Sequence, residues 1–245
     1  MDKLYDMIYK RKSIRKFDRS LTVTKDELEQ LEHYIQQIEP LSDEIKIRFK
    51  IVDSAETTCK RGEYCLLMYS EKKPYDLLNA GYMLERIDLY LASLDIGACW
   101  YGFGKPKEID PEGLDFIIMI AFGKCRSQDF RKDIAKCRRR KPDEIWEGSF
   151  YRDIAAEVRY APSSCNMQPW RVVSSNQSIS VYRTEHVASI MPKSKRPFYN
   201  TIDMGIFLCF LEICLLHGNY VFSRELFDRY EENGLIKIAQ YELKA

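Results

Sequence analysis

The chain has 245 residues, which is enough for one large domain or for two closely packed halves. Apolar residues make up 45% and charged residues 31% of it, so the composition excludes a disordered protein. Its 38 basic and 37 acidic residues give a net charge of +1. Without a global basic excess, we expect no nucleic-acid partner.

The cysteines and the N-terminal residues indicate a cellular compartment. Eight cysteines are present without a CxxC pair, which weakens zinc-ribbon and thioredoxin interpretations. Several lie inside apolar runs, and the charged start of the chain lacks a secretory apolar core. We therefore expect reduced, buried thiols in a cytoplasmic protein. The longest apolar stretch, 204–216, contains Glu212 and is too short to span a bilayer, so no membrane association is expected.

Hydrophobic spacing and turn signals predict the following elements in chain order. A short helix over 2–10 is followed by a helix that begins at the capping box Thr24–Glu27 and ends before Pro40. The basic segment 131–141, with seven positive residues and one negative, precedes Pro142 and marks a boundary. The remaining predicted helices are 75–95, 151–160 and 200–217, and the predicted strands are 45–51, 64–69, 114–122 (a central one), 171–174, 179–183 and 235–243.

The two halves of the chain share a pattern at a spacing of 124 residues. The order helix, strand, strand, helix recurs, and four residue pairs match in the two long helices: Tyr75 with Tyr199, Gly81 with Gly205, Asp88 with Glu212 and Leu91 with Leu215. Short matches between apolar helices also arise by chance. The recurring order favours duplication, with halves 1–142 and 143–245 packed around a pseudo-two-fold axis as one compact unit.

Two strings carry residues suited to binding chemistry. The string 161–170, Ala-Pro-Ser-Ser-Cys-Asn-Met-Gln-Pro-Trp, supplies short donors and acceptors that can face a planar heteroaromatic ligand, although composition alone favours an ordinary polar loop. Near the N-terminus, Arg11, Ser13 and Arg15 alternate. If that segment is extended, all three side chains fall on one side and suit a phosphate group; the alternative is a solvated basic patch.

Together these strings resemble the FMN-dependent nitroreductase family. The segment 94–103, Leu-Asp-Ile-Gly-Ala-Cys-Trp-Tyr-Gly-Phe, is similar to the Leu-Gly-x-Gly-x-x-Trp-x-Gly segment of that family. The strand 114–122, followed by a basic stretch, resembles the last core strand and the phosphate-contacting tail of the family. The resemblance implies an α+β nitroreductase-like fold built from duplicated half-units.

The chain departs from the usual family pattern in a complementary way. Ordinary members carry both strings in one subunit and build two FMN sites across a homodimer. Here the first half keeps the Arg-x-Ser-x-Arg string but has only Pro40-Leu-Ser42 in place of the loop. The second half keeps the loop, whereas its opening at 147–152 lacks the arginine string. The chain thus resembles the tandem, pseudo-dimeric (TM nitroreductase-like) branch, with one composite FMN site per chain.

The resemblance also implies roles for individual residues. Arg11, Ser13 and Arg15 would hold the phosphate and ribityl chain of FMN, and one or two of Arg138, Arg139 and Arg140 would add to the phosphate site. Pro162, Ser163, Ser164 and Asn166 would approach the isoalloxazine ring, and Trp100, Tyr101 and Gly102 would pass near its other side. No acid–base catalytic residue is assigned.

The expected function is transfer of electrons from NAD(P)H, a transient donor, through FMN to a small organic acceptor such as a nitroaromatic or a quinone. The chain has no GxGxxG in a strand–helix context, so the donor would stack on the flavin without a Rossmann domain. The alternatives are another flavin-dependent reaction, or a non-catalytic protein that binds a flavin or another ligand or has lost the cofactor. Either a monomer or a homodimer fits.

Histidine and cysteine are the other residue types with potential chemistry. The three histidines, at 33, 186 and 217, are far apart in sequence and predict no metal site. Cys165 falls within the loop expected to face the flavin. The two interpretations are a redox role and a small residue that fills a variable position, and the second is favoured.

Overall fold

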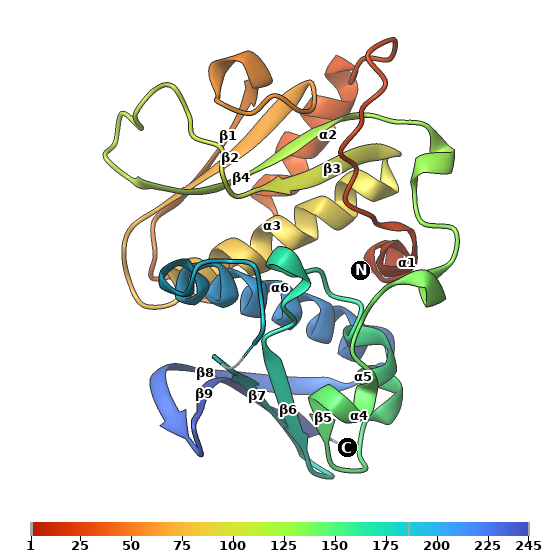
Figure 1. The fold of residues 1–245 in the computed structure, drawn as a ribbon, viewed down its shortest axis with the longest axis vertical. Helices are drawn as coiled ribbons and strands as arrows, with labels where there is room; N and C mark the ends of the chain where they lie inside the picture. The colour runs from red at the N-terminus through yellow and green to blue at the C-terminus, as the bar shows by residue number, and fades with distance from the viewer. Residues whose placement is uncertain (1, 186, 245) are drawn as a thin grey trace.

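The structure, a computed structural model, describes residues 2–185 and 187–244. It is a mixed α+β fold with two separate sheets, as the sequence predicts. Two long helices, α3 (Asp76–Ser93) and α6 (Arg196–His217), lie between the sheets (Figure 1). Each sheet therefore buries one face against a helix, and the helix pair forms the centre of the core.

The first sheet has the strand order β1-β2-β4-β3, with all neighbours antiparallel. The expected central strand, β4, does lie inside this sheet. Helix α1 packs beside α3 and α6, and α2 begins at Thr24 with the predicted capping box. The bounds are α1 Asp2–Lys10, α2 Lys25–Gln36, β1 Ile47–Asp53, β2 Tyr64–Ser70, β3 Ile96–Tyr101 and β4 Asp115–Lys124.

The second sheet has the order β5-β6-β7-β9-β8, in which only β5 pairs in parallel. If β6, β7, β8 and β9 are matched in chain order to β1, β2, β3 and β4, the order β6-β7-β9-β8 equals the order β1-β2-β4-β3 of the first sheet. All neighbours in these two sets are antiparallel. The bounds are α4 Pro142–Ile145, β5 Trp146–Glu147, α5 Arg152–Val158, β6 Trp170–Ser174, β7 Ser178–Arg183, β8 Val221–Glu232 and β9 Leu235–Lys244.

The long helices cross where Gly81 meets Gly205. A Cβ atom on Gly81 would lie 2.9 Å from the Cα of Gly205, and a Cβ on Gly205 would lie 3.0 Å from the Cα of Gly81. Both would also clash with carbonyl oxygens of the opposite helix. Only glycine permits so close an approach. The spacing of 124 residues that pairs these glycines in sequence thus corresponds to a direct contact.

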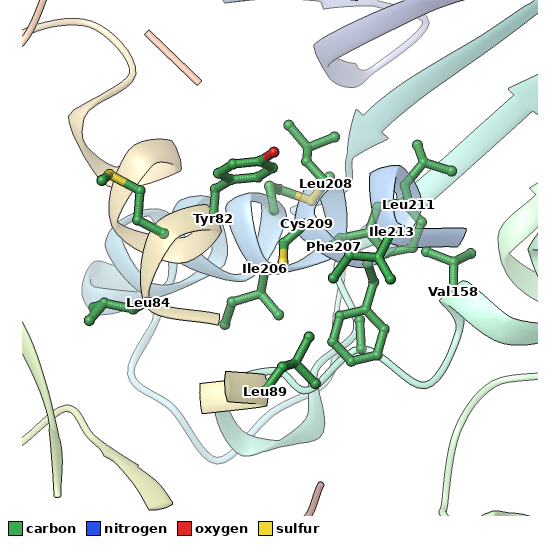
Figure 2. Packing of buried hydrophobic residues seen from close by; sticks show 14 of the residues in the cluster. Tyr82, Leu84, Leu89, Val158, Ile206, Phe207, Leu208, Cys209, Leu211 and Ile213 are labelled. Carbon is green, nitrogen blue, oxygen red and sulfur yellow. The ribbon is translucent and has the colours of Figure 1, made fainter. Parts of the chain in front are cut away.

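Apolar side chains of both helices fill the space between the sheets. Figure 2 shows Ile206 and Cys209 of α6 beside Tyr82 of α3, all of them buried. Helix α6 together with the turn before it is long and apolar enough to cross a membrane, but 83% of its most apolar window is buried in the protein. Core helices of soluble proteins pass the same test, and this burial fits a core helix.

Most predicted elements are present with bounds displaced by a few residues. Helix α6 begins four residues earlier than expected, at Arg196, because Pro197 occupies its first turn. The sequence-based prediction lacks two strands, β3 with six residues and β8 with twelve. Strand β3 contains two glycine or alanine residues, and β8 alternates charged with apolar residues on a half-exposed face, so neither gives a strong strand signal.

Candidate functional site

A cavity of about 320 Å³ is lined by residues of both strings singled out in the sequence. Its size is within the range of small-molecule sites. Residues from α1 to β3 form one side, and the loop 162–165 with α6 forms the other. Nine predicted site residues line it: Arg11, Ser13, Arg15, Trp100, Tyr101, Gly102, Pro162, Ser163 and Ser164.

A wider hollow of about 900 Å³ lies elsewhere, at the start of α3 and beside the β8–β9 hairpin. Its charged lining mixes both signs, with Lys72 and Lys73 near Asp76 and Asp228. None of the predicted site residues lines this hollow. The smaller cavity is therefore the better candidate, because its polar groups converge from segments with recognisable chemistry.

The arginine string is extended, as the alternation requires. Ser13 forms a parallel bridge with Ala98 of β3, and the backbone N–H of Ile14 donates to the carbonyl oxygen of Ala98 at 2.8 Å. Side chains alternate along such a segment. Arg11, Ser13 and Arg15 therefore face the cavity, while Ile14 is buried on the opposite side.

Arg11 forms a buried ion pair with Asp88. It is 3% exposed, and its Nε donates to Oδ2 of Asp88 at 2.8 Å, with Glu85 Oε1 at 3.7 Å. The indole N–H of Trp100 donates to both carboxyl groups at 3.1 Å. Burial raises the pKa of Glu85 well above its usual value, which favours the neutral acid. Asp88 forms the ion pair with Arg11.

The charge left for an anion therefore comes from other arginines. Neither Arg15 nor Arg61, which both line the cavity, forms an ion pair within the described ranges. Arg61 also lies over the ring of Tyr101, at 5.9 Å. Sequence reasoning missed Arg61, Glu85 and Asp88, and the two acids could have been found as charges on the apolar face of a long helix.

The Pro-Ser-Ser loop is held in an unusual backbone conformation. Cys165, Asn166 and Gln168 have positive φ angles of 50°, 56° and 52°. The hydroxyl oxygen of Ser163 accepts from the backbone N–H of Gln168 at 2.9 Å. Residues other than glycine and asparagine rarely adopt such angles, so the surroundings must stabilise the loop.

The brace for this loop is the basic segment 138–140. Nη1 of Arg139 donates to Oδ1 of Asn166 at 2.7 Å, and its Nε donates to the carbonyl of Ala161 at 3.1 Å. The backbone N–H of Arg140 donates to Oε1 of Gln168 at 2.8 Å, and Asn166 donates to the carbonyl of Arg138 at 3.0 Å. Burial lowers the pKa of Arg139 to about 10.

Four predicted site residues are consequently outside the cavity lining. Arg138, Arg139, Arg140 and Asn166 lie beside the Pro-Ser-Ser loop and hydrogen-bond with it or with one another. Their contacts support the loop from behind. The direct phosphate and ring contacts expected for them stay predictions.

Asp203 on α6 is the most unusual residue of the cavity, and sequence reasoning missed it. Its Oδ1 accepts from the backbone N–H of Ser164 at 2.9 Å and from the Ser164 hydroxyl at 3.1 Å. Asp203 is 1% exposed, and its Oδ2 has no hydrogen-bond partner among the described residues. Burial raises its pKa to about 7, against the lowering effect of Ser164. An aspartate within the apolar run of α6 was the available signal.

The remaining walls are apolar or aromatic. Tyr199 donates its hydroxyl to the carbonyl of Gly102 at 2.7 Å and so joins α6 to the end of β3. Phe103 is 78% exposed at the rim, and Cys165 is also exposed there. The inner surface is completed by Ile118, Met191, Ile202 and Ile206.

The histidines and cysteines of the described residues are dispersed. No cluster of three or more metal-ligating side chains occurs within 2–185 and 187–244. His186 lies outside the described residues, and His33 and His217 make separate contacts with Gln37 and Tyr5. All eight cysteines are free, six of them buried, as predicted for reduced thiols.

Comparison with known proteins identifies the family. The family model described as "Putative TM nitroreductase" matches residues 3–214, so the chain belongs to this family. A solved "putative nitroreductase" of Thermotoga maritima MSB8 is 18% identical, covers 98% of this chain and 92% of its own, and gives a TM-score of 0.63. That likeness shows a shared nitroreductase-like fold.

A second solved structure aligns less completely. It is described as a "Putative NADH dehydrogenase/NAD(P)H nitroreductase" of Bacteroides thetaiotaomicron VPI-5482, is 16% identical and gives a TM-score of 0.40. The alignment covers 53% of this chain and 90% of that one. A search of curated proteins finds no match.

Proposed function

We propose that this protein is an FMN-dependent oxidoreductase that takes electrons from NAD(P)H and passes them to a small organic acceptor such as a nitroaromatic or a quinone. The observation that carries the proposal is one cavity that unites Arg11–Arg15 of the first half with Pro162–Ser164 of the second. Membership of a nitroreductase family supports the same class of reaction.

The residues of the cavity fit FMN by their chemistry. Arg15, Arg61 and Ser13 offer charge and donors to a phosphate. The apolar side chains Ile118, Ile202 and Ile206 suit a planar ring, and Ser163 and Ser164 offer polar contacts at its edge. Arg11 would contribute less charge than the resemblance implies, because Asp88 already pairs with it. Its role would be to hold the extended string and Trp100 in place.

When bound, FMN would supply the hydride-accepting ring. The chain's own residues would bind and orient this ring and exclude water around it. The positive charges of Arg15 and Arg61 would favour an anionic ligand, and the exposed Phe103 at the rim would offer an apolar surface to an aromatic acceptor. This division of labour needs no catalytic triad. The free, mainly buried thiols are consistent with the cytoplasmic location that we also propose.

We also propose that the halves 1–142 and 143–245 are two copies of one ancestral unit, and that only one of two original sites is kept. Support comes from the region around Ser42. There the buried Glu212 accepts hydrogen bonds from the buried Tyr82 and Tyr241 and pairs with the half-buried Arg224. Arg224 also donates to the carbonyl of Leu41 at 3.1 Å and so covers the Ser42 loop.

The proposal predicts a flavin spectrum with one equivalent of FMN per chain after incubation with excess FMN and desalting. Anaerobic NADH or NADPH should then bleach that spectrum, and a quinone should restore it. Arg15→Ala should weaken FMN retention strongly, whereas Arg229→Ala, an exposed arginine of the β8 strand, serves as the control. Two equivalents would contradict the single site. Retained FMN that resists NAD(P)H would indicate a binding protein, and no retained FMN would contradict the cofactor assignment.

A further inference from the structure

We infer that Asp203 contacts the planar ligand directly, as a neutral carboxylic acid that donates a hydrogen bond from its free oxygen. This inference rests on the proposed flavin site and names a ligand-binding residue within it. Asp203 lies on α6 and lines the cavity together with Ile202 and Ile206. It is therefore the polar group on an otherwise apolar stretch of wall.

The hydrogen bonds of Asp203 are incomplete in a way that points to a ligand. Oδ1 is fully used by the backbone N–H and the hydroxyl of Ser164, at 2.9 and 3.1 Å. Oδ2 is buried and has no partner within the described chain. Leaving a buried carboxyl oxygen without a partner is costly, and native proteins rarely do so without a reason. A ligand in the adjoining cavity supplies that partner.

Asn79 occupies the position of α3 that matches Asp203 of α6, and both polar atoms of its side chain are hydrogen-bonded. Asn79 lies two residues before Gly81, as Asp203 lies two residues before Gly205. The Asn79 amide accepts from the backbone N–H of Ser42 at 3.0 Å and donates to its carbonyl at 2.8 Å. Asn79 is thus satisfied by its own loop, whereas Asp203 leaves one oxygen for the cavity.

The charges around Asp203 favour a proton on that oxygen. No basic side chain forms an ion pair with it in the described structure, and burial raises its pKa to about 7. A neutral acid can donate to a ring carbonyl or ring nitrogen, while an ionised carboxylate would face the lone pairs of the same acceptor. The charged and titratable groups that share its cavity or contact the cavity's residues are Arg11, Arg15, Arg61, Cys99, Tyr101, Cys165, Tyr199 and, through Arg11, Glu85 and Asp88.

Glu85 requires a control, because burial also raises the pKa of its carboxyl. It lies on α3 and contacts two residues of the cavity wall, Arg11 and Trp100. A pH effect transmitted by Glu85 would persist when Asp203 is replaced. Glu85→Gln and Asp203→Asn therefore separate the two acids, and the amide in Asp203→Asn repeats the arrangement that Asn79 already adopts.

The test is the dissociation constant of FMN, measured by quenching of flavin fluorescence between pH 5.5 and pH 8.5. For the wild-type chain and for Glu85→Gln we expect binding to weaken about tenfold from pH 6 to pH 8, as the neutral acid is lost. Asp203→Asn should bind FMN with little change over this range, apart from any effect of the FMN phosphate, which all variants share. Thermal unfolding of each variant checks that it is folded.

The outcomes separate this inference from the proposed function. Wild-type binding that is independent of pH, or the same pH dependence in Asp203→Asn, overturns the role of Asp203 and leaves the flavin site standing. Failure of the wild-type chain to bind FMN at any pH overturns both. A second measurement needs no variant: FMN should shift the infrared C=O stretch of a protonated carboxylic acid in the wild-type protein, and absence of that shift at pH 6 overturns the inference.

Discussion

The loop that contains Ser42 and the loop that contains Ser164 each contact one side chain of a long buried helix, but the two helix side chains carry different functional groups. In the first half Ser42 is held by the amide of Asn79, and in the second half Ser164 is held by the carboxyl of Asp203. The amide of Asn79 both accepts from and donates to its loop, whereas one oxygen of the Asp203 carboxyl, which lines the cavity, has no partner among the described residues. The two positions differ by one atom, an amide nitrogen in Asn79 and a carboxyl oxygen in Asp203, and we propose that this difference separates a closed position from a ligand-binding one.

Two acidic residues further along the same helices also differ in their surroundings. Nine residues after Asn79, Asp88 pairs with Arg11 and accepts from Trp100, which are both on the cavity wall. Nine residues after Asp203, Glu212 is surrounded by Tyr82, Tyr241 and Arg224. The helices offer equivalent acids, and the neighbouring segments decide whether the space above them stays open.

The largest effect is expected from removing the cation of each acid. Arg11→Met would leave Asp88 without its buried counter-charge and should lower the free energy of unfolding by about 3–5 kcal/mol. Arg224→Met should cost less, about 2 kcal/mol, because the two tyrosine hydroxyls still donate to Glu212. Urea unfolding measures both. Equal losses would mean that the two acid clusters are not differently supported.

The FMN affinity of the same two variants sharpens the contrast. Arg11→Met should lose FMN retention, because Arg11 holds the wall of the cavity, and Arg224→Met should keep it. Loss of FMN from Arg224→Met in a folded protein would contradict the assignment of the closed side.

At the helix crossing the two halves should behave alike. Gly205→Ala and Gly81→Ala each force a methyl group into the backbone of the opposite helix and should each destabilise the fold by about 3 kcal/mol. Gly113→Ala is the matched control, since its Cβ would meet no atom within 4 Å and only its φ of +76° is strained. Thermal unfolding would expose an error if one helix glycine tolerated alanine and the other did not.

Asp203→Asn should remove a pH dependence of the free energy of unfolding, and Asn79→Asp should introduce one at the matching position of α3. Burial raises the pKa of Asp203 to about 7 from 3.8, so its contribution to stability is largest below pH 4 and falls between pH 4 and pH 7. Asp203→Asn should therefore gain stability relative to wild type by roughly 1 kcal/mol per pH unit over that window. Asn79→Asp should show the opposite trend. Denaturant unfolding at pH 5 and pH 8 would reveal parallel curves if Asp203 were an ordinary surface-like acid.

The smallest effect concerns the serine hydroxyls. Ser164→Ala removes the hydroxyl that Asp203 accepts and should cost about 1 kcal/mol and weaken FMN binding severalfold. Ser42→Ala should change neither stability nor FMN binding measurably, because Asn79 contacts only the backbone of Ser42. A similar loss of FMN affinity in both variants would remove the distinction between the loops.

Much of the fold could be predicted because it follows from local patterns. The capping box at Thr24, the apolar period of α3 and the apolar run of β4 each identify an element without tertiary information. Strand β8 could not be found this way, since it is stabilised by pairing with β9 and exposes much of its side-chain surface. Its neighbour β9 was predicted from the turn before it.

Only those site residues that belong to short continuous motifs could be predicted from the sequence. Ser13 and Ser164 stand in short motifs, and both line the cavity. The roles of Asp203 and Glu85 depend on burial, which raises the pKa of a carboxyl in ways that spacing cannot reveal. The ion pair of Arg11 with Asp88 likewise joins residues 77 positions apart, and nothing in the motif itself shows it.

The two walls of the cavity come from distant parts of the sequence, so they are synthesised at different times. The arginine string, β3 and the Arg11–Asp88 pair belong to the part of the chain that is synthesised first, and their contacts are complete within it. The Pro-Ser-Ser loop and α6 follow more than 60 residues later. Because α3 packs mainly on α6, the first wall gains its core partner, and the cavity its second wall, only after α6 has been synthesised.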